Sequence, residues 1–465
     1  MLLEQMSNLY GSVDAARRWL DLAFEQILAM GFRRSLWDPC LMRMTLPKAE
    51  VAEYIQKDIL IESDQEFKRE NDNAMSADDT ANEFGIMHEG ARDIPEVAKF
   101  DFDQLIGNQP ANDDPDTSWV TGVLWVDDGL YASNDRDLLE NVKDKMLLKF
   151  PGTFEWDPTS FLGMAIRRPS MGKMIIEQHV LAEKMVETAK LSNCKPHPIP
   201  LTAMVDVSER PDTQSVKNQV KSKMNNVQEV VGQLGYLIHT RPELKTAYGQ
   251  MSRIASNPAM KHLKALKRVM RYVQGTLDHG IEFTREGPQD LVVFVDTNFD
   301  ETVYTGIVAY YNGGPIEART MRQKTVKISS FTAEGVGLCE CVRLVVYLRA
   351  LIRDTGERLD KPTTIYCDNQ AAIAVANRTD GHTNKARHYK IRMKWVQERI
   401  AAGDVIIKYV KSAMNVADLL TKPLALPTWR ILAPQVRGAD PIVALNEAVN
   451  GTQQSLEDED LADQN

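Results

Sequence analysis

Apolar residues between positions 291 and 422 alternate between two periods, one typical of strands and one typical of helices. Runs of strand length, rich in β-branched and aromatic residues, cover 291–296, 305–312, 324–330, 363–368 and 404–410. Helical spacing covers 332–354, 369–377, 390–403 and 416–422. The predicted order is three strands, a helix, a strand, two helices, a strand and a helix, which is typical of a mixed α/β (α+β) domain over residues 288–425.

The pattern upstream of residue 288 is less regular. Residues 13–31 have the spacing of an amphipathic helix that ends at Gly31. Two β-rich runs within 117–133 flank Asp127 and Asp128 and predict a hairpin with this pair at its turn. A second strand pair is expected at 161–166 and 173–178, followed by helices at 179–191, 226–240 and 259–274.

The predicted helix at 259–274 has two chemically distinct sides. One side carries Lys261, Lys264, Lys267, Arg268 and Arg271, and the other carries Leu263, Leu266, Met270 and Val273. A polar face that is entirely basic suits the phosphate backbone of a nucleic acid. An ordinary solvated face is an equally good interpretation of the same spacing.

The charge of the chain is unevenly distributed. The total is −10, of which residues 49–118 carry −14 and residues 440–465 carry −7, so the rest of the chain carries +11. We expect residues 49–116 to be an acidic, disordered insertion with a short helix near 50–60, and residues 426–465 to be an acidic tail. The basic remainder is compatible with a polyanionic partner and with an ordinary surface.

The sequence shows no feature of secretion or membrane insertion. No run approaches the roughly 20 apolar residues that span a bilayer, and the first residues lack the pattern of a signal peptide. The five cysteines are scattered and form no zinc-binding pattern. We therefore expect an intracellular protein without a membrane partner, in a compartment (cytoplasm or nucleus) that the sequence does not distinguish.

Four acidic residues fall at the ends of the predicted elements of 288–425. Asp296 and Asp368 end strands, Glu334 enters the long helix and Asp418 opens the last one. Acids in these places can converge on one edge of a sheet, where oxygen-only ligands favour Mg²⁺ or Mn²⁺. Two such ions support phosphodiester hydrolysis. Taken singly, each acid is more commonly a helix cap or a surface charge.

Several stretches near these acids resemble the ribonuclease H domain of copia-type retrotransposon polyproteins. They are GPIEARTMRQKTVKISSFTAE, IYCDNQAAIAVAN, RHYKIR and NVADLLTKPL. The family's four catalytic acids match FVDTNF, TAE, CDNQ and ADLLTK in this chain. The resemblance therefore implies that Asp296, Glu334, Asp368 and Asp418 bind two metal ions and catalyse hydrolysis.

The resemblance continues upstream into the reverse transcriptase of the same family. The matching stretches are LYGSVDAARRW, GFRRSLWDPCL, LWVDDGLYAS, FLGMAI, VGQLGYLIHTRPEL and HLKALKRVMRYVQGTLDHG. They imply a partial palm (1–48 and 117–200), a thumb or connection (201–287) and a ribonuclease H-like domain (288–425). Asp127 and Asp128 match the metal-binding aspartate pair of the polymerase, and the basic helix matches a contact to the template–primer duplex. We expect Arg387, Lys390 and Arg392 to touch the substrate backbone.

The chain departs from the family pattern at several positions. The third palm aspartate is not found, so we expect no DNA polymerisation by this chain alone and leave room for a partner subunit that supplies it. Asn298 and Thr332 stand where acids are common, and Gly335 and Gly337 lie in the first turns of a helix, which disfavours it by about 1 kcal/mol each.

Three functions therefore stay open at this point. The leading hypothesis is a reverse transcriptase fragment whose ribonuclease H domain cuts the RNA strand of RNA·DNA hybrids with two Mg²⁺ ions. The alternatives are a catalytically dead remnant that binds nucleic acid and a phosphoesterase that acts on small substrates.

Overall fold

The computed structural model describes residues 23–56, 114–150, 152–208, 226–285, 289–300, 302–323, 330–378 and 387–438, together with Asn218 and Met224. The chain divides into two units, one formed by residues 1–156 and 350–358 and the other by residues 157–349 and 359–465. The division falls inside the segment 117–200 that the sequence suggested as one part of the palm. Each unit is described separately below.

The first unit contains a four-stranded antiparallel sheet in the order β1-β2-β3-β4. Its elements are β1 Arg33–Arg34, β2 Leu41–Pro47, α3 Lys48–Gln56, β3 Thr117–Trp125, β4 Asp128–Ser133 and α6 Arg136–Lys149. A helical segment at 23–29 ends before Gly31, whose φ of 95° stops it as predicted. The sheet and helices share a core that includes Ile27, Met42, Met44, Val120 and Leu138.

The hairpin of β3 and β4 has a tight turn. Trp125 pairs with Asp128, which leaves Val126 and Asp127 as the turn residues. Val126 has a φ of 54°, a conformation that a β-branched residue rarely adopts. This turn agrees with the hairpin that the sequence predicted.

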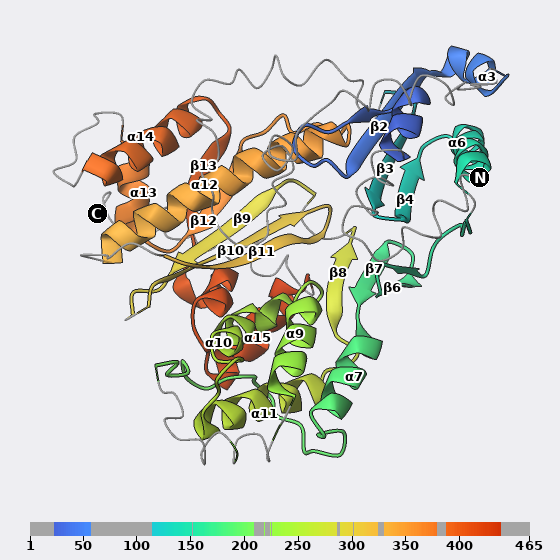
Figure 1. Cartoon of the computed structure of the whole chain (residues 1–465). Helices are drawn as coiled ribbons and strands as arrows, with labels where there is room; N and C mark the ends of the chain where they lie inside the picture. Colours follow the sequence, from blue (N-terminus) through green and yellow to red (C-terminus); the bar gives the residue numbers. More distant parts are fainter. Residues whose placement is uncertain are drawn as a thin grey trace, which may run out of the picture. The chain divides into compact units, whose positions relative to one another are not determined.

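The second unit begins with another antiparallel sheet, in the order β5-β6-β7-β8, and helices lie next to it (Figure 1). Its elements are β5 Ser160–Phe161, β6 Met164–Ser170, β7 Lys173–Glu177, β8 Gly280–Thr284, α7 His179–Thr188, α9 Val227–Leu237, η2 Pro242–Leu244, α10 Lys245–Ser252 and α11 Met260–Gln274. The strand pair and all three predicted helices are present. In α11 the apolar side predicted from the sequence is buried.

A buried ion pair holds these helices to the rest of the second unit. Arg241 and Glu243 are almost completely buried, and the Arg241 Nε atom donates to Glu243 Oε1 at 2.7 Å. Arg241 also donates to the backbone carbonyl of Thr276 at 2.8 Å, and Arg437 lies 3.5 Å from Glu243. The network therefore ties residues near 241, 276 and 437 together.

The remaining strands of the second unit form a five-stranded mixed sheet in the order β11-β10-β9-β12-β13, accompanied by helices of which α12 runs on into residues 350–354 of the first unit. They are β9 Val292–Thr297, β10 Tyr304–Tyr311, β11 Gly314–Arg322, α12 Ser330–Asp354, β12 Thr363–Cys367, α13 Gln370–Ala376, α14 Arg387–Ala401, β13 Val405–Tyr409, η3 Ser412–Met414, η4 Val416–Leu420 and α15 Leu426–Val436. The first three strands pair antiparallel, whereas β12 is parallel to both β9 and β13. The predicted mixed α/β class and the order of its elements are confirmed.

Two glycines let the layers of this region approach closely. A Cβ atom on Gly337 of α12 would lie 2.2 Å from the Thr297 hydroxyl of β9. A Cβ atom on Gly306 of β10 would lie 2.5 Å from the carbonyl oxygen of Ala417 in η4. Because successive strand residues face opposite sides, α12, which Figure 1 shows along the sheet, covers one face, and the contact of Gly306 with Ala417 places η4 on the other.

Two elements of this region differ from the prediction. An unpredicted strand, β11 Gly314–Arg322, follows β10 because Asn312 and Gly313, with φ values of 50° and 78°, form a tight hairpin turn. The strand expected at 324–330 lies outside the described residues except for Ser330, where α12 begins. Residues 426–436 are helix α15 rather than the start of a tail, because Trp429, Leu432 and Val436 are buried in the core.

Some predictions lie outside the described residues. These are the start of the helix at 13–31, most of the acidic insertion (57–113) and residues 439–465. The short helix expected near 50–60 is present as α3. No helix in the described part of the chain is long and apolar enough to cross a membrane.

Candidate active site

Three of the four predicted catalytic acids meet at one edge of the five-stranded sheet. Asp296 lies near the end of β9, and Asp368 directly follows β12. These strands are parallel neighbours, with Val295 opposite Cys367, so their carboxyl ends share the edge. Glu334 reaches the same place from the second turn of α12, and carboxylate oxygens of the three residues lie within 4.8 Å of one another.

The fourth acid, Asp418, approaches from η4. Its negative charge acts on the carboxyl group of Asp296. Lys422 Nζ lies 3.0 Å from Asp418 Oδ1, and the Thr421 hydroxyl donates to Asp296 Oδ2 at 2.5 Å. The structure therefore brings three of the predicted acids within 4.8 Å of one another and places the fourth, Asp418, near enough for its charge to act on Asp296.

Burial and mutual repulsion disfavour ionisation of this cluster. Burial, with the nearby charge of Asp418, raises the pKa of Asp296 to about 6. Burial, with the charges of Asp296 and Asp368, raises the pKa of Glu334 to about 8. The pKa values of Asp368 and Asp418 are also raised, chiefly by burial. The protein alone leaves the negative charge of this site undercompensated.

The charge and donor set of the cluster suit a hard divalent cation. All four side chains offer carboxylate oxygens, which Mg²⁺ and Mn²⁺ prefer, and positive charge would relieve their repulsion. Of the described residues, Asp296, Glu334 and Asp368 form the one group of three or more acids, histidines or cysteines with ligand atoms this close together. The residues at this edge therefore fit a divalent metal centre.

Lys422 is a member of the site that the sequence analysis did not single out. Burial works against its charge, but Asp418 and Asp296 outweigh burial and raise the pKa of its ammonium group. The signal was in the sequence, since Lys422 lies one helical turn after Asp418 within the matched stretch ADLLTK. Ser412 also belongs to the site, since its hydroxyl donates to Asp368 Oδ2 at 2.6 Å, but nothing in the sequence indicated this contact.

The departures from the family pattern have structural roles. Asn298 is buried, and its side-chain oxygen accepts the backbone N–H of Tyr304 at 2.6 Å, which closes the turn between β9 and β10. Gly335 lies against the ring of Tyr389, where a Cβ atom would approach to 2.5 Å. Gly335 and Gly337 thus allow α12 to pack closely enough to deliver Glu334.

The polymerase-like pair, Asp127 and Asp128, is exposed on the hairpin of the first unit. No third carboxylate joins them among the described residues of either unit. Trp125 beside them is 49% exposed. A two-acid site of this kind offers fewer ligands than the cluster at β9 and β12.

The predicted nucleic-acid-binding residues of α11 differ in their surroundings. Lys261 pairs with Asp206 at 2.8 Å, whereas Lys264 is exposed. Lys267, Arg268 and Arg271 are half-buried.

The connector at 195–199 adds two basic residues next to α11. Arg271 Nε donates to the carbonyl of Lys195 at 2.6 Å, and His197 N–H donates to the carbonyl of Arg271 at 3.0 Å. Burial and the charges of Arg268 and Arg271 lower the pKa of His197. The sequence analysis missed Lys195 and His197 because only tertiary contacts bring them to the helix.

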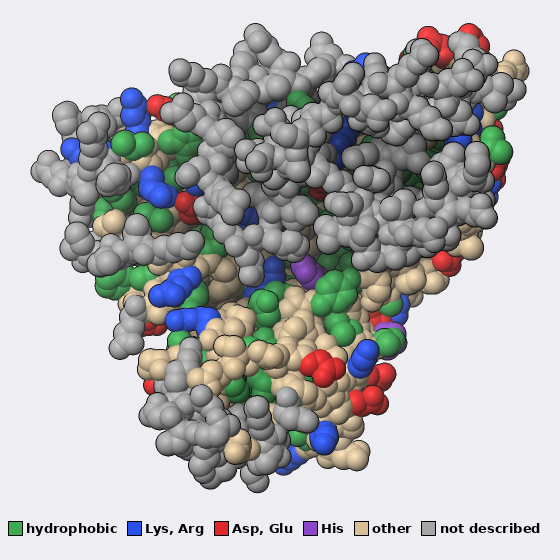
Figure 2. All heavy atoms as spheres, viewed as in Figure 1, with side chains coloured by type: hydrophobic (Ala, Val, Ile, Leu, Met, Phe, Trp, Pro, Cys, Tyr) green, Lys and Arg blue, Asp and Glu red, His purple; other side chains and the backbone are tan. Residues whose placement is uncertain are grey.

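The other predicted contacts lie on α14. Lys390 is exposed, and Arg392 forms an ion pair with Glu340 of α12 at 2.8 Å. The side chain of Arg387 lies outside the described residues. On the face that Figure 2 shows, the Lys and Arg side chains of the described residues are dispersed and form no single continuous stripe.

The sheet order and the acidic edge agree with the ribonuclease H-like fold that the sequence predicted, and the sequence matches place the chain in the class of retroelement proteins. More particularly, the chain is a homologue of retrovirus-related Pol polyproteins of plant transposons. It is 27% identical over 324 residues to the polyprotein of transposon RE1 of Arabidopsis thaliana, covering 69% of this chain and 22% of that one. It is 26% identical over 316 residues to that of transposon TNT 1-94 of Nicotiana tabacum, covering 66% and 23%.

Further similarities concern shorter or more distant matches. Secreted RxLR effector protein 161 of Plasmopara viticola is 39% identical over 131 residues, which cover 27% of this chain and 92% of that protein. Among solved structures, LC11-RNase H1 matches with 13% identity and a TM-score of 0.23, covering 29% of this chain and 94% of that chain. The chain spans about a fifth of the length of the Pol polyproteins it matches, and no family model matches it.

Proposed function

We propose that the second unit hydrolyses the RNA strand of RNA·DNA hybrids with two Mg²⁺ or Mn²⁺ ions. The observation that carries the proposal is the meeting of Asp296, Glu334 and Asp368, with Asp418 beside them, at one sheet edge. The homology to Pol polyproteins supports a nucleic acid as the substrate.

In this proposal the four acids hold the ions, and the surrounding residues hold the acids. When bound, the ions activate a water molecule and stabilise the leaving oxygen of the phosphodiester. Thr421 and Ser412 orient the carboxylates of Asp296 and Asp368 through their hydroxyl groups. Lys422 offsets part of the negative charge at Asp418.

The basic residues of α11 and of the adjacent connector support binding of the duplex backbone. Lys264, Lys267, Arg268 and Arg271 supply positive charge, to which Lys195 adds. Contacts of this type hold phosphates and orient a duplex without reading its sequence. We therefore expect cleavage with little sequence preference.

The test is Mg²⁺-dependent cleavage of a hybrid by the full chain and by Asp368→Asn. We expect the substitution to reduce cleavage by at least about a hundredfold, since it removes a charge from the ion-binding edge. Asp360→Asn is a matched control, because Asp360 is exposed and lies shortly before β12 in the same unit. The control should cleave like the wild type.

The opposite result is equally clear. Hybrid binding without cleavage by the wild-type chain, in both Mg²⁺ and Mn²⁺, would show a binding remnant rather than a nuclease. Hydrolysis of a small phosphoester that competing hybrid duplex fails to inhibit would instead point to a phosphoesterase for small substrates.

A further inference from the structure

A groove in the second unit lies outside the carboxylate cluster. It has a volume of about 620 Å³ and is lined by the β6–β7 hairpin, the end of β8 and the turn after β10. Backbone hydrogen bonds join the three walls: Arg285 N–H donates to the carbonyl of Gly172, and Thr284 N–H donates to the carbonyl of Gly313, each at 3.0 Å. The groove is therefore built into the fold, although its walls come from segments far apart in the sequence.

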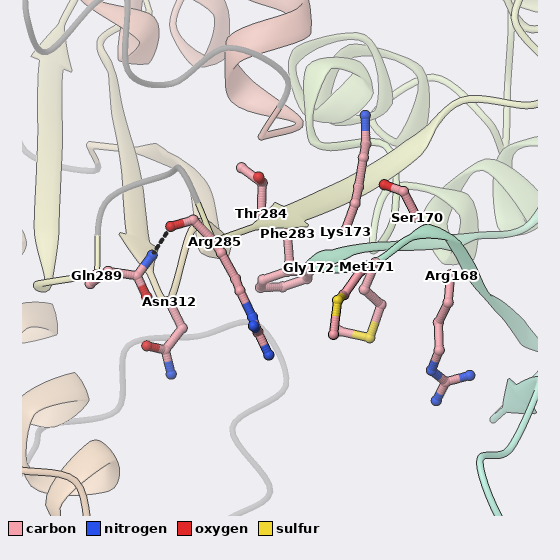
Figure 3. A pocket seen from close by; sticks show the side chains of 11 residues that line it. Arg168, Ser170, Met171, Gly172, Lys173, Phe283, Thr284, Arg285, Gln289 and Asn312 are labelled. Atoms are coloured by element: carbon pink, nitrogen blue, oxygen red, sulfur yellow. Dashed lines mark hydrogen bonds between the residues drawn. The ribbon is translucent and has the colours of Figure 1, made fainter.

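The side chains of the groove project to two sides, and a basic residue lies on each. Figure 3 shows Arg168, Met171 and Arg285 projecting to one side, with Asn312 on the same side, while Lys173 projects to the other. Lys173 is paired with Glu282 at 2.6 Å. Among the described residues, no carboxylate forms an ion pair with the guanidinium group of Arg168 or Arg285.

Both arginines are partly held in place. Arg168 Nη1 donates to the carbonyl of Pro158 at 3.0 Å, and the aliphatic part of Arg285 lies over Gly172. Between them, Met171 at the hairpin tip is 95% exposed. Two guanidinium groups on either side of an exposed apolar side chain match a phosphodiester strand, in which phosphates alternate with sugars.

The groove and the carboxylates lie at opposite ends of the same strands. Asp296 pairs with Gly306, and Asn312 follows six residues later along the adjoining strand. At about 3.4 Å per residue, Asn312 at the groove therefore lies roughly 20 Å from Asp296. A nucleic-acid strand advances about 3.4 Å per nucleotide, so some six nucleotides span this distance.

We propose that this groove binds the phosphodiester backbone of a nucleic acid about six nucleotides away from the carboxylate cluster. The inference rests on the proposed function for its class of ligand, but not for catalysis. Arg168 and Arg285 bind phosphates, and Met171 contacts the sugar between them.

The test measures binding of a 20-base-pair RNA·DNA hybrid to the full chain in EDTA, over a range of salt concentrations. The double variant Arg168→Gln with Arg285→Gln neutralises both arginines. It should reduce the magnitude of the slope of log affinity against log salt by about 2, because each lost phosphate contact reduces that slope by about 0.9. Affinity at 0.1 M salt should fall at least about tenfold. Arg168→Lys with Arg285→Lys should keep the slope, which separates loss of charge from loss of folding.

A double variant with the same change in net charge serves as the control. Lys184→Gln with Lys394→Gln removes two exposed charges from α7 and α14 of the same unit. A control that loses as much slope as the arginine variant would overturn the proposal, and so would an arginine variant with wild-type slope and affinity.

The outcome for the nuclease is read separately, from cleavage in Mg²⁺. Arginine-dependent binding without any cleavage supports the groove and contradicts the nuclease. Cleavage with no effect of the arginines on binding contradicts the groove alone. A wild-type chain that does not bind the hybrid contradicts both.

Discussion

Replacing Glu334 with glutamine should stabilise the metal-free protein while removing its response to Mg²⁺. Glu334 is packed against Asp296 and Asp368 at the sheet edge. Burial and these two neighbours raise the pKa of its carboxyl group from 4.5 to about 8. Glutamine keeps the shape of the side chain and removes the charge that the folded state disfavours.

The sign and size follow from the pKa. Because the folded-state pKa is raised, the folded protein is not penalised below pH 4.5 and loses stability as the pH rises from about 4.5 to about 8. At pH 7 the ordinary pKa lies about 2.5 pH units below the pH, and each unit corresponds to about 1.36 kcal/mol, so the loss is at most about 3.4 kcal/mol. Glu334→Gln escapes this loss.

The assay is hydrogen exchange of amides in β9 and β12 with EDTA, which follows the second unit even if the first unfolds independently. We expect slower exchange in Glu334→Gln than in the wild type at pH 7, after correction for the intrinsic rates, and equal protection near pH 4.5. Adding Mg²⁺ should protect the wild type by ligand linkage and leave the variant unchanged.

Two results would refute this reasoning. One is a variant that is less stable than the wild type at pH 7 in EDTA, since this would mean that Glu334 is stabilised as an anion. The other is a difference in stability that does not shrink as the pH falls to 4.5. Equal protection of both proteins by Mg²⁺ would remove Glu334 from the ion-binding set.

Three further substitutions test the packing and backbone conformation of the two units. Glu243→Gln leaves two buried arginines without their counter-charge and should destabilise the second unit by about 3 to 5 kcal/mol in urea unfolding, whereas Glu282→Gln, in a more exposed pair, should cost under about 1 kcal/mol. Gly337→Ala should lower the free energy of unfolding by about 1 to 3 kcal/mol and should also reduce hybrid cleavage, because the added methyl group pushes α12 away from β9. A gain in stability would show that the higher helix propensity of alanine outweighs this clash. Val126→Gly should raise the melting temperature of the first unit, because the φ of 54° strains valine by about 1 kcal/mol and does not strain glycine. An unchanged or lower melting temperature would show that valine is not strained there.

Local patterns in the sequence were sufficient for most elements of the second unit. The strands at β9, β10, β12 and β13 and the helices α12, α13 and α14 follow directly from apolar period and length. Strand β11 was not predicted because it begins with Gly314 and Pro315, which interrupt the alternating pattern, and because its register depends on pairing with β10. Helix α15 was missed for a related reason, since its buried face becomes evident only against the core that it covers.

The four acids were identifiable from the sequence because each stands at the end of a predictable element and within a familiar stretch. Their convergence was decided by tertiary structure, through the parallel pairing of β9 with β12 and the close packing of α12 that Gly335 and Gly337 allow. The raised pKa values, the role of Lys422 and the groove at Arg168 and Arg285 also depend on residues distant in sequence. The spacing of apolar residues and the composition are properties of the sequence itself and can be obtained from it. Burial, charge coupling and cavities arise between segments and exist only once those segments have packed.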